Sequence, residues 1–361
     1  MIFDSTSSMP TFQFIEEISH ILPYYFINPS GINSLSTKSK EILIKSRNVI
    51  ANYLGCTNSE VIFTSSSTES NNLAIKGFSF GKKGSIITTD FEHPSILHPL
   101  KTLEKQGFTI IHIETDNNGW VEPKTIEKYI QKDTILLTMG ALCRETATLR
   151  NITEIVKIIK KNNNNIICHF DLWGLYYPDS FIDLKELDMA SFDGPYLLGP
   201  QGVGFLYVKK GIKLSPLIEG GTQEKGLRAG EENLFGIFAL SQAIKFLAEQ
   251  RKELEAKLRM YDNYIRDNIS LFSMSKNGYE VLGLFSYGLQ DIEAEMLILS
   301  ADKYNFFLNY PSPCMANGIK HKIKQKCGFD DVIVFRILPT SSQEEIKQFI
   351  SILNEISRVK I

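Results

Sequence analysis

Apolar and polar residues follow two rhythms along this chain, one typical of helices and one typical of strands. Residues 38–54 carry apolar side chains at helical spacing, which predicts an amphipathic helix. Further along, short β-branched runs bounded by polar residues predict buried strands. These runs are Ser85–Thr89, Thr109–Ile113, Thr134–Thr138 and Asn165–His169. Helical segments such as Ile152–Lys161 lie between them, so the pattern predicts a doubly wound α/β domain with right-handed crossovers.

A second region follows this α/β pattern. Residues Leu240–Ile269 are rich in Ala, Leu, Glu, Lys and Arg, which predicts one long helix. Strand and helix signals continue from about residue 279 to residue 361, as expected for a smaller α+β domain. The chain of 361 residues is long enough to bury a large core and to form one large and one smaller domain.

Composition narrows the class of function. The chain is 43% hydrophobic and 22% charged with a formal net charge of −2, so we expect no nucleic-acid binding. No apolar run approaches the roughly eighteen residues of a membrane span, and the start lacks the pattern of a signal peptide, so we expect a cytoplasmic protein without membrane contact. The five cysteines lack CxxC spacing, which indicates reduced thiols and predicts neither disulfides nor a metal site.

Several motifs occur along the chain in a characteristic order. They are Phe3-Asp4, Asn28-Pro-Ser30, Ile62-Phe-Thr-Ser-Ser-Ser-Thr-Glu-Ser-Asn-Asn72, Glu92-His-Pro94, Gly199-Pro-Gln-Gly-Val-Gly204 and Gly220-Gly-Thr-Gln-Glu-Lys-Gly-Leu-Arg-Ala-Gly-Glu-Glu-Asn233. In order and spacing the chain resembles the cysteine desulfurases, pyridoxal-phosphate (PLP) enzymes of the class V aminotransferase group. The resemblance implies PLP-dependent transferase fold type I and a homodimer with active sites at the subunit interface. It also implies a large domain over residues 16–250, with a mixed, mostly parallel seven-stranded sheet, and a small α+β domain built from residues 1–15 and 251–361.

The chain departs from this family where the cofactor lysine is expected. The family reads Ser-Gly-His-Lys before its Gly-Pro-x-Gly-x-Gly turn, and these four positions are Asp193, Gly194, Pro195 and Tyr196 in this chain. A phenol cannot form the Schiff base that a lysine amine forms with an aldehyde. No lysine occurs from residue 186 to residue 208 that could take over. The resemblance therefore predicts that PLP binding and PLP chemistry are lost.

The positions expected around the cofactor phosphate are partly retained and partly changed. Ser67 and Thr68, at a predicted helix start, match the family's phosphate cradle. Asp193 and Glu231 match positions at which the family has hydrogen-bond donors to the phosphate. A carboxylate about 4 Å from a phosphate charge costs on the order of 4 kcal/mol at an effective dielectric constant near 20. Arg228 either offsets this charge or pairs with a neighbouring glutamate, Glu224 or Glu231.

The positions expected around the cofactor ring show the same mixture. Asp171 matches the aspartate that pairs with the pyridine nitrogen in the family. His93 is retained from the family pattern, and we expect it to be a hydrogen-bonded structural histidine. Trp173 matches a small residue beneath the ring, and its indole is large enough to occupy the ring space. We expect Trp173 and Tyr196 to fill a vacated cavity, because voids in protein interiors are costly.

Three functions remain open. The first is a catalytically inactive pseudoenzyme that binds a protein partner or has an accessory role in a sulfur pathway. The second is a PLP-independent reaction or a small-molecule ligand in the remodelled pocket, using Asp171, Asp193, Tyr196 and Cys314. The third is a cysteine desulfurase with non-covalent PLP, which converts L-cysteine to L-alanine. Cys314 matches the family cysteine that carries the persulfide in that reaction.

Overall fold

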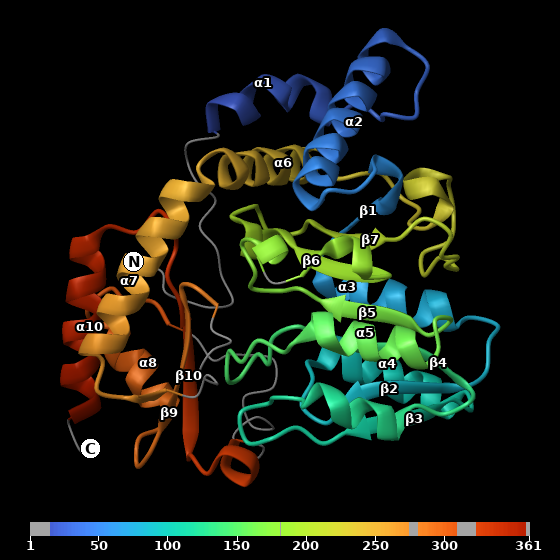
Figure 1. Cartoon of the computed structure of the whole chain (residues 1–361). Helices are drawn as coiled ribbons and strands as arrows, with labels where there is room; N and C mark the ends of the chain where they lie inside the picture. The colour runs from blue at the N-terminus through green and yellow to red at the C-terminus, as the bar shows by residue number, and fades with distance from the viewer. Residues whose placement is uncertain (1–14, 181, 274–280, 309–322, 359–361) are drawn as a thin grey trace.

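The computed structural model describes residues 15–180, 182–273, 281–308 and 323–358. Figure 1 shows two lobes, one built on a seven-stranded sheet and the other on a three-stranded sheet. The large sheet has the strand order β1-β7-β6-β5-β4-β2-β3. Its strands are β1 (Val61–Thr64), β2 (Ser85–Thr89), β3 (Thr109–Ile113), β4 (Thr134–Gly140), β5 (Ile167–Asp171), β6 (Met189–Asp193) and β7 (Gly204–Val208).

The direction of the strands confirms the predicted fold class. Strands β2, β3, β4, β5 and β6 pair in parallel, whereas β7 pairs antiparallel with both β1 and β6. Successive residues of one strand belong to different apolar clusters, since Ile86 and Leu136 lie in one and Ile87 and Leu137 in the other. Because successive side chains of a strand point to opposite faces, the sheet is buried on both faces, as in a doubly wound α/β domain.

The helices largely follow the predicted pattern. They are α1 (Ile15–Tyr25), α2 (Ser34–Leu54), α3 (Ser67–Asn72), α4 (Pro94–Lys105), α5 (Ile152–Asn162), α6 (Leu234–Glu249), α7 (Arg251–Asn268), α8 (Ala294–Asp302) and α10 (Gln343–Arg358). Helix α2 covers the predicted segment 38–54 and begins earlier, because the side chain of Asn33 accepts the backbone N–H of Ser36 and caps it. Helix α5 and strands β2 and β3 start at the predicted residues.

The prediction of one long helix over Leu240–Ile269 is wrong. The segment forms two helices, α6 and α7, that meet at Gln250, whose φ of −96° and ψ of 8° depart from helical values. Helix α6 packs on α2 beside the large sheet, whereas α7 packs on α10 beside the small sheet. Because the two halves bury their apolar faces against different lobes, the chain turns between them.

The small lobe holds the antiparallel sheet β10-β9-β8, with β8 (Phe272–Ser273), β9 (Leu284–Leu289) and β10 (Asp331–Arg336). The passage from α6 to α7 lies at the predicted domain boundary near residue 250. The division into domains stays a prediction, and the part assigned to residues 1–14 lies outside the described residues. Within the described residues, no helix combines the length and apolar character that crossing a membrane requires.

Candidate functional site

A buried carboxylate, Asp171, lies where three parallel strands end together. In the sheet register Gly140 of β4 is beside Asp171 of β5, which is beside Ser191 of β6. Asp171 is 1% exposed and accepts hydrogen bonds from Asn71 Nδ2 at 2.9 Å and from the backbone N–H of Trp173 at 3.2 Å. Burial raises the pKa of Asp171, and the nearby charge of Arg144 and the two hydrogen bonds oppose that rise.

A short hydrogen-bonded chain connects Asp171 to helix α4. Asn71, which lies on α3, also donates from Nδ2 to Ser95 Oγ at 2.8 Å. His93 Nδ1 accepts the backbone N–H of Ser95 at 3.2 Å and so caps α4. Burial, assisted by the positive charge of Arg144, lowers the pKa of His93 to about 2, so its ring is neutral. Asn71 and Ser95 were not among the predicted site residues, although Asn71 lies within the retained Ser-Asn-Asn sequence.

Two aromatic rings pack against each other in the interior, and one of them belongs to Trp173, whose backbone N–H binds Asp171. The rings of Trp173 and Tyr196 meet edge to face, with centroids 5.4 Å apart and an interplanar angle of 68°. They are only 2% and 6% exposed, and Trp173 Nε1 donates to the carbonyl of Leu142 at 3.3 Å. The turn after Trp173 needs Gly174, whose φ is 78° and where a Cβ atom would lie 3.1 Å from Leu142 Cδ1. The contact between the two rings therefore lies in a closely packed interior.

Two buried arginines alternate with these rings. The guanidinium carbon of Arg144 lies 4.1 Å from the ring centroid of Trp173 and 5.7 Å from that of Tyr196, and Arg144 Nη1 donates to Tyr196 Oη at 3.0 Å. The guanidinium carbon of Arg336, from β10, lies 5.4 Å from the Tyr196 centroid and 3.8 Å from the Tyr176 centroid. We call these five residues the arginine–aromatic stack. It joins the large lobe to the small one.

Backbone contacts hold Arg336 in this stack. Its Nη2 donates to the carbonyls of Gly174 at 3.1 Å and Tyr196 at 2.9 Å. In the structure the guanidinium is engaged by protein carbonyls and rings, so its position is fixed by the fold of both lobes.

A second carboxylate lies at the start of α3. Asp193 ends β6, and its Oδ2 accepts a hydrogen bond from Ser67 Oγ at 3.0 Å. Burial raises the pKa of Asp193 to about 6, although hydrogen bonds from Ser67 lower it, and the negative charge of Asp171 adds to the rise. The start of this helix, which the sequence predicts as an anion cradle, thus already has an anionic side chain beside it.

The remaining predicted site residues lie away from Asp171 or outside the described residues. Thr68 is exposed on α3, and Glu231 is exposed and accepts a hydrogen bond from Asn28 Nδ2 at 3.3 Å. The pairing of Arg228 with Glu224 or Glu231 was one of two alternatives, and within the single chain Arg228 pairs with Glu69. Arg228 Nε lies 3.1 Å from Glu69 Oε1, because both side chains meet at the exposed side of α3. Cys314 lies outside the described residues.

The glutamate that Arg228 was expected to bind has another partner. Glu224 is buried, and its carboxylate accepts hydrogen bonds from both terminal nitrogens of Arg47 and from the backbone N–H of Phe63, the last at 2.8 Å. This ion pair ties the segment around Glu224 to α2 and β1. Arg47 therefore balances the negative charge of Glu224, and this ion pair does not include Asp171.

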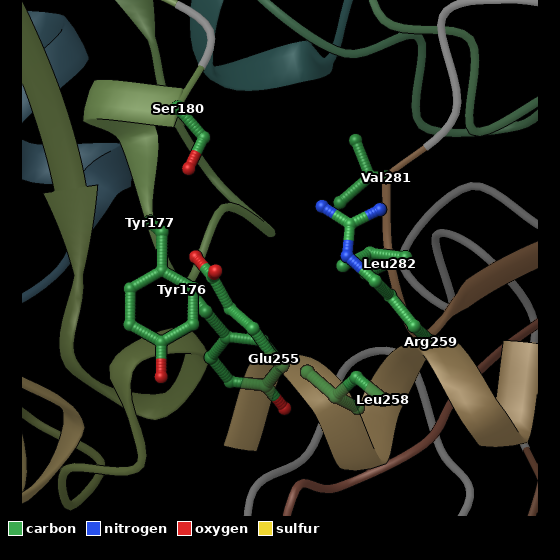
Figure 2. Close-up of a pocket in the computed structure, with 8 residues that line it drawn as sticks. All are labelled: Tyr176, Tyr177, Ser180, Glu255, Leu258, Arg259, Val281 and Leu282. Carbon is green, nitrogen blue, oxygen red and sulfur yellow. The ribbon is translucent and has the colours of Figure 1, made fainter. Parts of the chain in front are cut away.

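A separate cavity of about 180 Å³ lies between the two lobes (Figure 2). One side is formed by the segment after β5 and the other by α7 with the segment before β9. The lining residues are Tyr176, Tyr177, Ser180, Glu255, Leu258, Arg259, Val281 and Leu282. Arg251 connects two of these residues, donating to Ser180 Oγ at 2.7 Å and to Glu255 Oε1 at 2.9 Å. Tyr176 belongs to both this cavity and the arginine–aromatic stack.

Comparison with known proteins assigns the chain to one protein family. The family model described as aminotransferase class V matches residues 2–348. The chain is 33% identical over 314 residues to a cysteine desulfurase IscS of Dictyoglomus turgidum, covering 84% of this chain and 79% of that protein. It is also 33% identical over 347 residues to cysteine desulfurase IscS 1 of Archaeoglobus fulgidus, covering 89% and 88% of the two chains.

Solved structures show the same overall similarity. A protein described as NifS-like has a TM-score of 0.88 and 26% identity, covering 99% of this chain and 98% of the other. The apo structure of a cysteine desulfurase from Thermococcus onnurineus has a TM-score of 0.82 at 21% identity, covering 99% and 94%. The second similarity concerns the fold alone.

Proposed function

Since the chain belongs to the class V aminotransferase family and is related to cysteine desulfurases, we propose that it is a pseudoenzyme whose cofactor pocket is filled by its own side chains. In this proposal it carries out no PLP chemistry and acts as a homodimer, by binding a protein partner or in an accessory role in a sulfur pathway. The observation that carries the proposal is the buried edge-to-face contact between the rings of Trp173 and Tyr196, two residues whose family counterparts border the cofactor. A fold does not imply a function, so the residues of the pocket decide between the alternatives.

The residues around Asp171 do not fit the family cofactor. A PLP ring needs a flat space beside this aspartate and an amine to bind its aldehyde. Trp173, whose backbone N–H binds Asp171, packs its ring against Tyr196 almost without exposure, and residue 196 is a phenol. Moving the indole aside would also break the contact of Arg144 with the Trp173 ring and the hydrogen bond to Leu142. Each of these contacts adds to the cost of opening the pocket.

The charge at the start of α3 also disfavours the cofactor phosphate. Ser67 Oγ already donates to Asp193, and a bound phosphate would compete for that donor while lying next to a carboxylate. Repulsion between two such anions in a partly buried site amounts to several kcal/mol. The residues at the phosphate end of the pocket and those at the ring end therefore both disfavour PLP binding.

An exposed apolar surface supports the homodimer. Phe26, Ile32, Leu35, Leu217 and Ile218 are large apolar side chains that remain exposed in the single chain. Of these five, Phe26 lines a surface groove together with residues 27–29 and 231–234. Apolar side chains that remain exposed at a groove mark protein interfaces. Sedimentation should give twice the mass of the 40.9 kDa chain, and a monomer at micromolar concentration would contradict the homodimer.

A PLP titration tests the proposed loss of cofactor chemistry. The purified protein with an excess of PLP is expected to show only the absorbance of free PLP, because residue 196 carries a phenol in place of the amine that would bind the aldehyde. Borohydride treatment should then leave no pyridoxyl group on the chain at a specific residue. A Schiff-base band that borohydride fixes at one lysine would overturn the proposal. Sulfide release from L-cysteine that depends on Cys314 would instead establish the desulfurase with non-covalent PLP.

A further inference from the structure

The cavity between the two lobes is large enough for one small molecule. Its volume is about 180 Å³, whereas pockets for drug-sized ligands measure roughly 300–1,000 Å³. An apolar cavity of roughly 150 Å³ holds benzene, so this cavity has room for one ring with a short substituent. Asp171, Trp173 and Tyr196 do not line it, so it is distinct from the altered cofactor pocket.

The walls of the cavity are mostly apolar and come from both lobes. Leu258 of α7 and Val281 are only 1% and 4% exposed, and Leu282 is half-buried. Tyr176 and Tyr177, from the segment after β5, form the other side (Figure 2). Moving an apolar ligand from water onto such walls is favourable, because it removes apolar surface from water.

Arg259 gives the cavity a positive charge that no neighbouring residue balances. The carboxylate of Glu255 is already paired with Arg251, whose Nε lies 2.9 Å from Glu255 Oε1. Glu255 also lies four residues before Arg259 on α7, a spacing at which helical ion pairs form. Within the described residues, however, Arg259 makes no hydrogen bond and no ion pair. Figure 2 shows its exposed guanidinium extending toward Val281, whereas the Glu255 carboxylate points toward the Ser180 side.

The hydroxyl of Tyr176 is a second polar group that a ligand can engage. Tyr176 is 4% exposed, and no hydrogen bond of ordinary geometry reaches its Oη within the described residues. The guanidinium carbon of Arg336 lies 3.8 Å from the ring centroid, so Arg336 contacts the face of the ring. Figure 2 shows the hydroxyl pointing toward the helix that carries Leu258. A buried polar group without a partner is costly, so a ligand that supplies one gains affinity.

We propose that this cavity binds a small carboxylic acid with an apolar body about the size of one ring. The carboxylate pairs with Arg259, whose planar guanidinium suits two parallel hydrogen bonds to a carboxylate. The apolar body packs on Leu258, Val281 and Leu282. Because the walls belong to both lobes, a bound acid contacts both of them. This inference does not depend on the proposed function, because the cavity and the altered cofactor pocket are different sites.

A ligand-observed NMR titration of the full chain with benzoate tests the proposal. Benzoate should bind saturably at one site per chain, with a Kd on the order of 1 mM, which corresponds to a small ligand with few polar contacts. Benzamide has the same shape without the charge and should bind about fivefold more weakly, since Arg259 is exposed and its ion pairs are partly screened by solvent. Benzoate that does not saturate, or benzamide that binds as tightly as benzoate, would overturn the proposal.

Arg259→Gln tests the assigned cation. The variant should bind benzoate about fivefold more weakly than the native chain and should bind benzamide unchanged, because only the charged ligand loses a partner. Lys252→Gln is the matched control. Lys252 is exposed on the same helix two turns earlier and does not line the cavity, so its loss should leave the Kd for benzoate almost unchanged. Equal affinity of the native chain and Arg259→Gln for benzoate would contradict the assigned site.

Leu282→Trp tests the cavity itself. Leu282 is half-buried, so the larger side chain can fill the cavity without entering the core, and binding of both benzoate and benzamide should be lost. Far-UV circular dichroism checks that the variant is folded. Binding that persists in a folded Leu282→Trp variant would show that the acid binds elsewhere. The PLP titration is a separate measurement, so either result can fail while the other stands.

Discussion

Replacing Trp173 with alanine should lower the free energy of unfolding by about 4 kcal/mol, within the range for removing a large aromatic side chain from a protein core. The indole is 2% exposed, packs edge to face on Tyr196 and supports the guanidinium of Arg144. Its loss leaves a cavity that the rigid strand ends β5 and β6 cannot close. Denaturant unfolding of the variant and the native chain measures the difference.

Added indole provides a specific control for this cavity. Indole in excess should raise the stability of Trp173→Ala, because the ligand binds only the folded state, and should leave the native chain unchanged. Trp173→Phe should lose much less stability than Trp173→Ala, since a ring still packs against Tyr196. A Trp173→Ala variant within about 1 kcal/mol of the native chain would show that the indole does not fill the pocket.

Replacing Asp193 with asparagine should change how stability depends on pH. Burial raises the pKa of the folded carboxyl to about 6, whereas an unfolded aspartate titrates near pH 4. The native chain therefore loses stability as the pH rises from about 4 to about 6, because the folded state then gives up a proton that it binds more tightly. Two pKa units correspond to about 3 kcal/mol. Asp193→Asn lacks this loss and should gain about that much relative to the native chain between pH 4 and pH 7.

The matched control for Asp193 is an exposed aspartate. Asp302 lies at the end of α8 on the surface, so Asp302→Asn removes one negative charge without changing the interior. Asparagine at position 193 can still accept the hydrogen bond from Ser67 Oγ, which limits other losses. A stability difference between Asp193→Asn and the native chain that stays constant from pH 4 to pH 7 would contradict the raised pKa of Asp193 in the folded state.

Local pattern was enough to predict most strands and helices of the large lobe. The β-branched runs at Ser85–Thr89 and Thr109–Ile113 are bounded by polar or turn residues, so both the type and the limits of the strands were readable. The break at Gln250 had no such signal, because no Gly or Pro marks it. It exists because α6 and α7 pack on different lobes, and single-sequence periodicity does not contain that information.

The candidate site was predictable to the extent that it depends on strand ends. Asp171 and Asp193 end neighbouring parallel strands, which brings their carboxyl groups to the same edge of the sheet. The roles of Arg144 and Arg336 depend on a turn and on the docking of the small lobe, which place both guanidiniums beside Tyr196. Two arginines far apart in sequence give no local sign of such an arrangement. The motifs therefore identify the positions at which this chain differs from its family. The residues that pack around those positions, such as Arg144 and Arg336, follow only from the three-dimensional structure.

The most direct test of a self-filled pocket is a PLP titration of the Tyr196→Lys variant beside the native chain. The variant restores an amine at residue 196 but keeps Trp173, Arg144 and Asp193 in the pocket. If these side chains exclude the cofactor, the variant should show only free PLP in its absorbance spectrum, and borohydride should fix no pyridoxyl group at residue 196. A Schiff-base band in Tyr196→Lys that borohydride fixes at that residue would show that the pocket can still open for the cofactor, and would contradict the proposed pseudoenzyme.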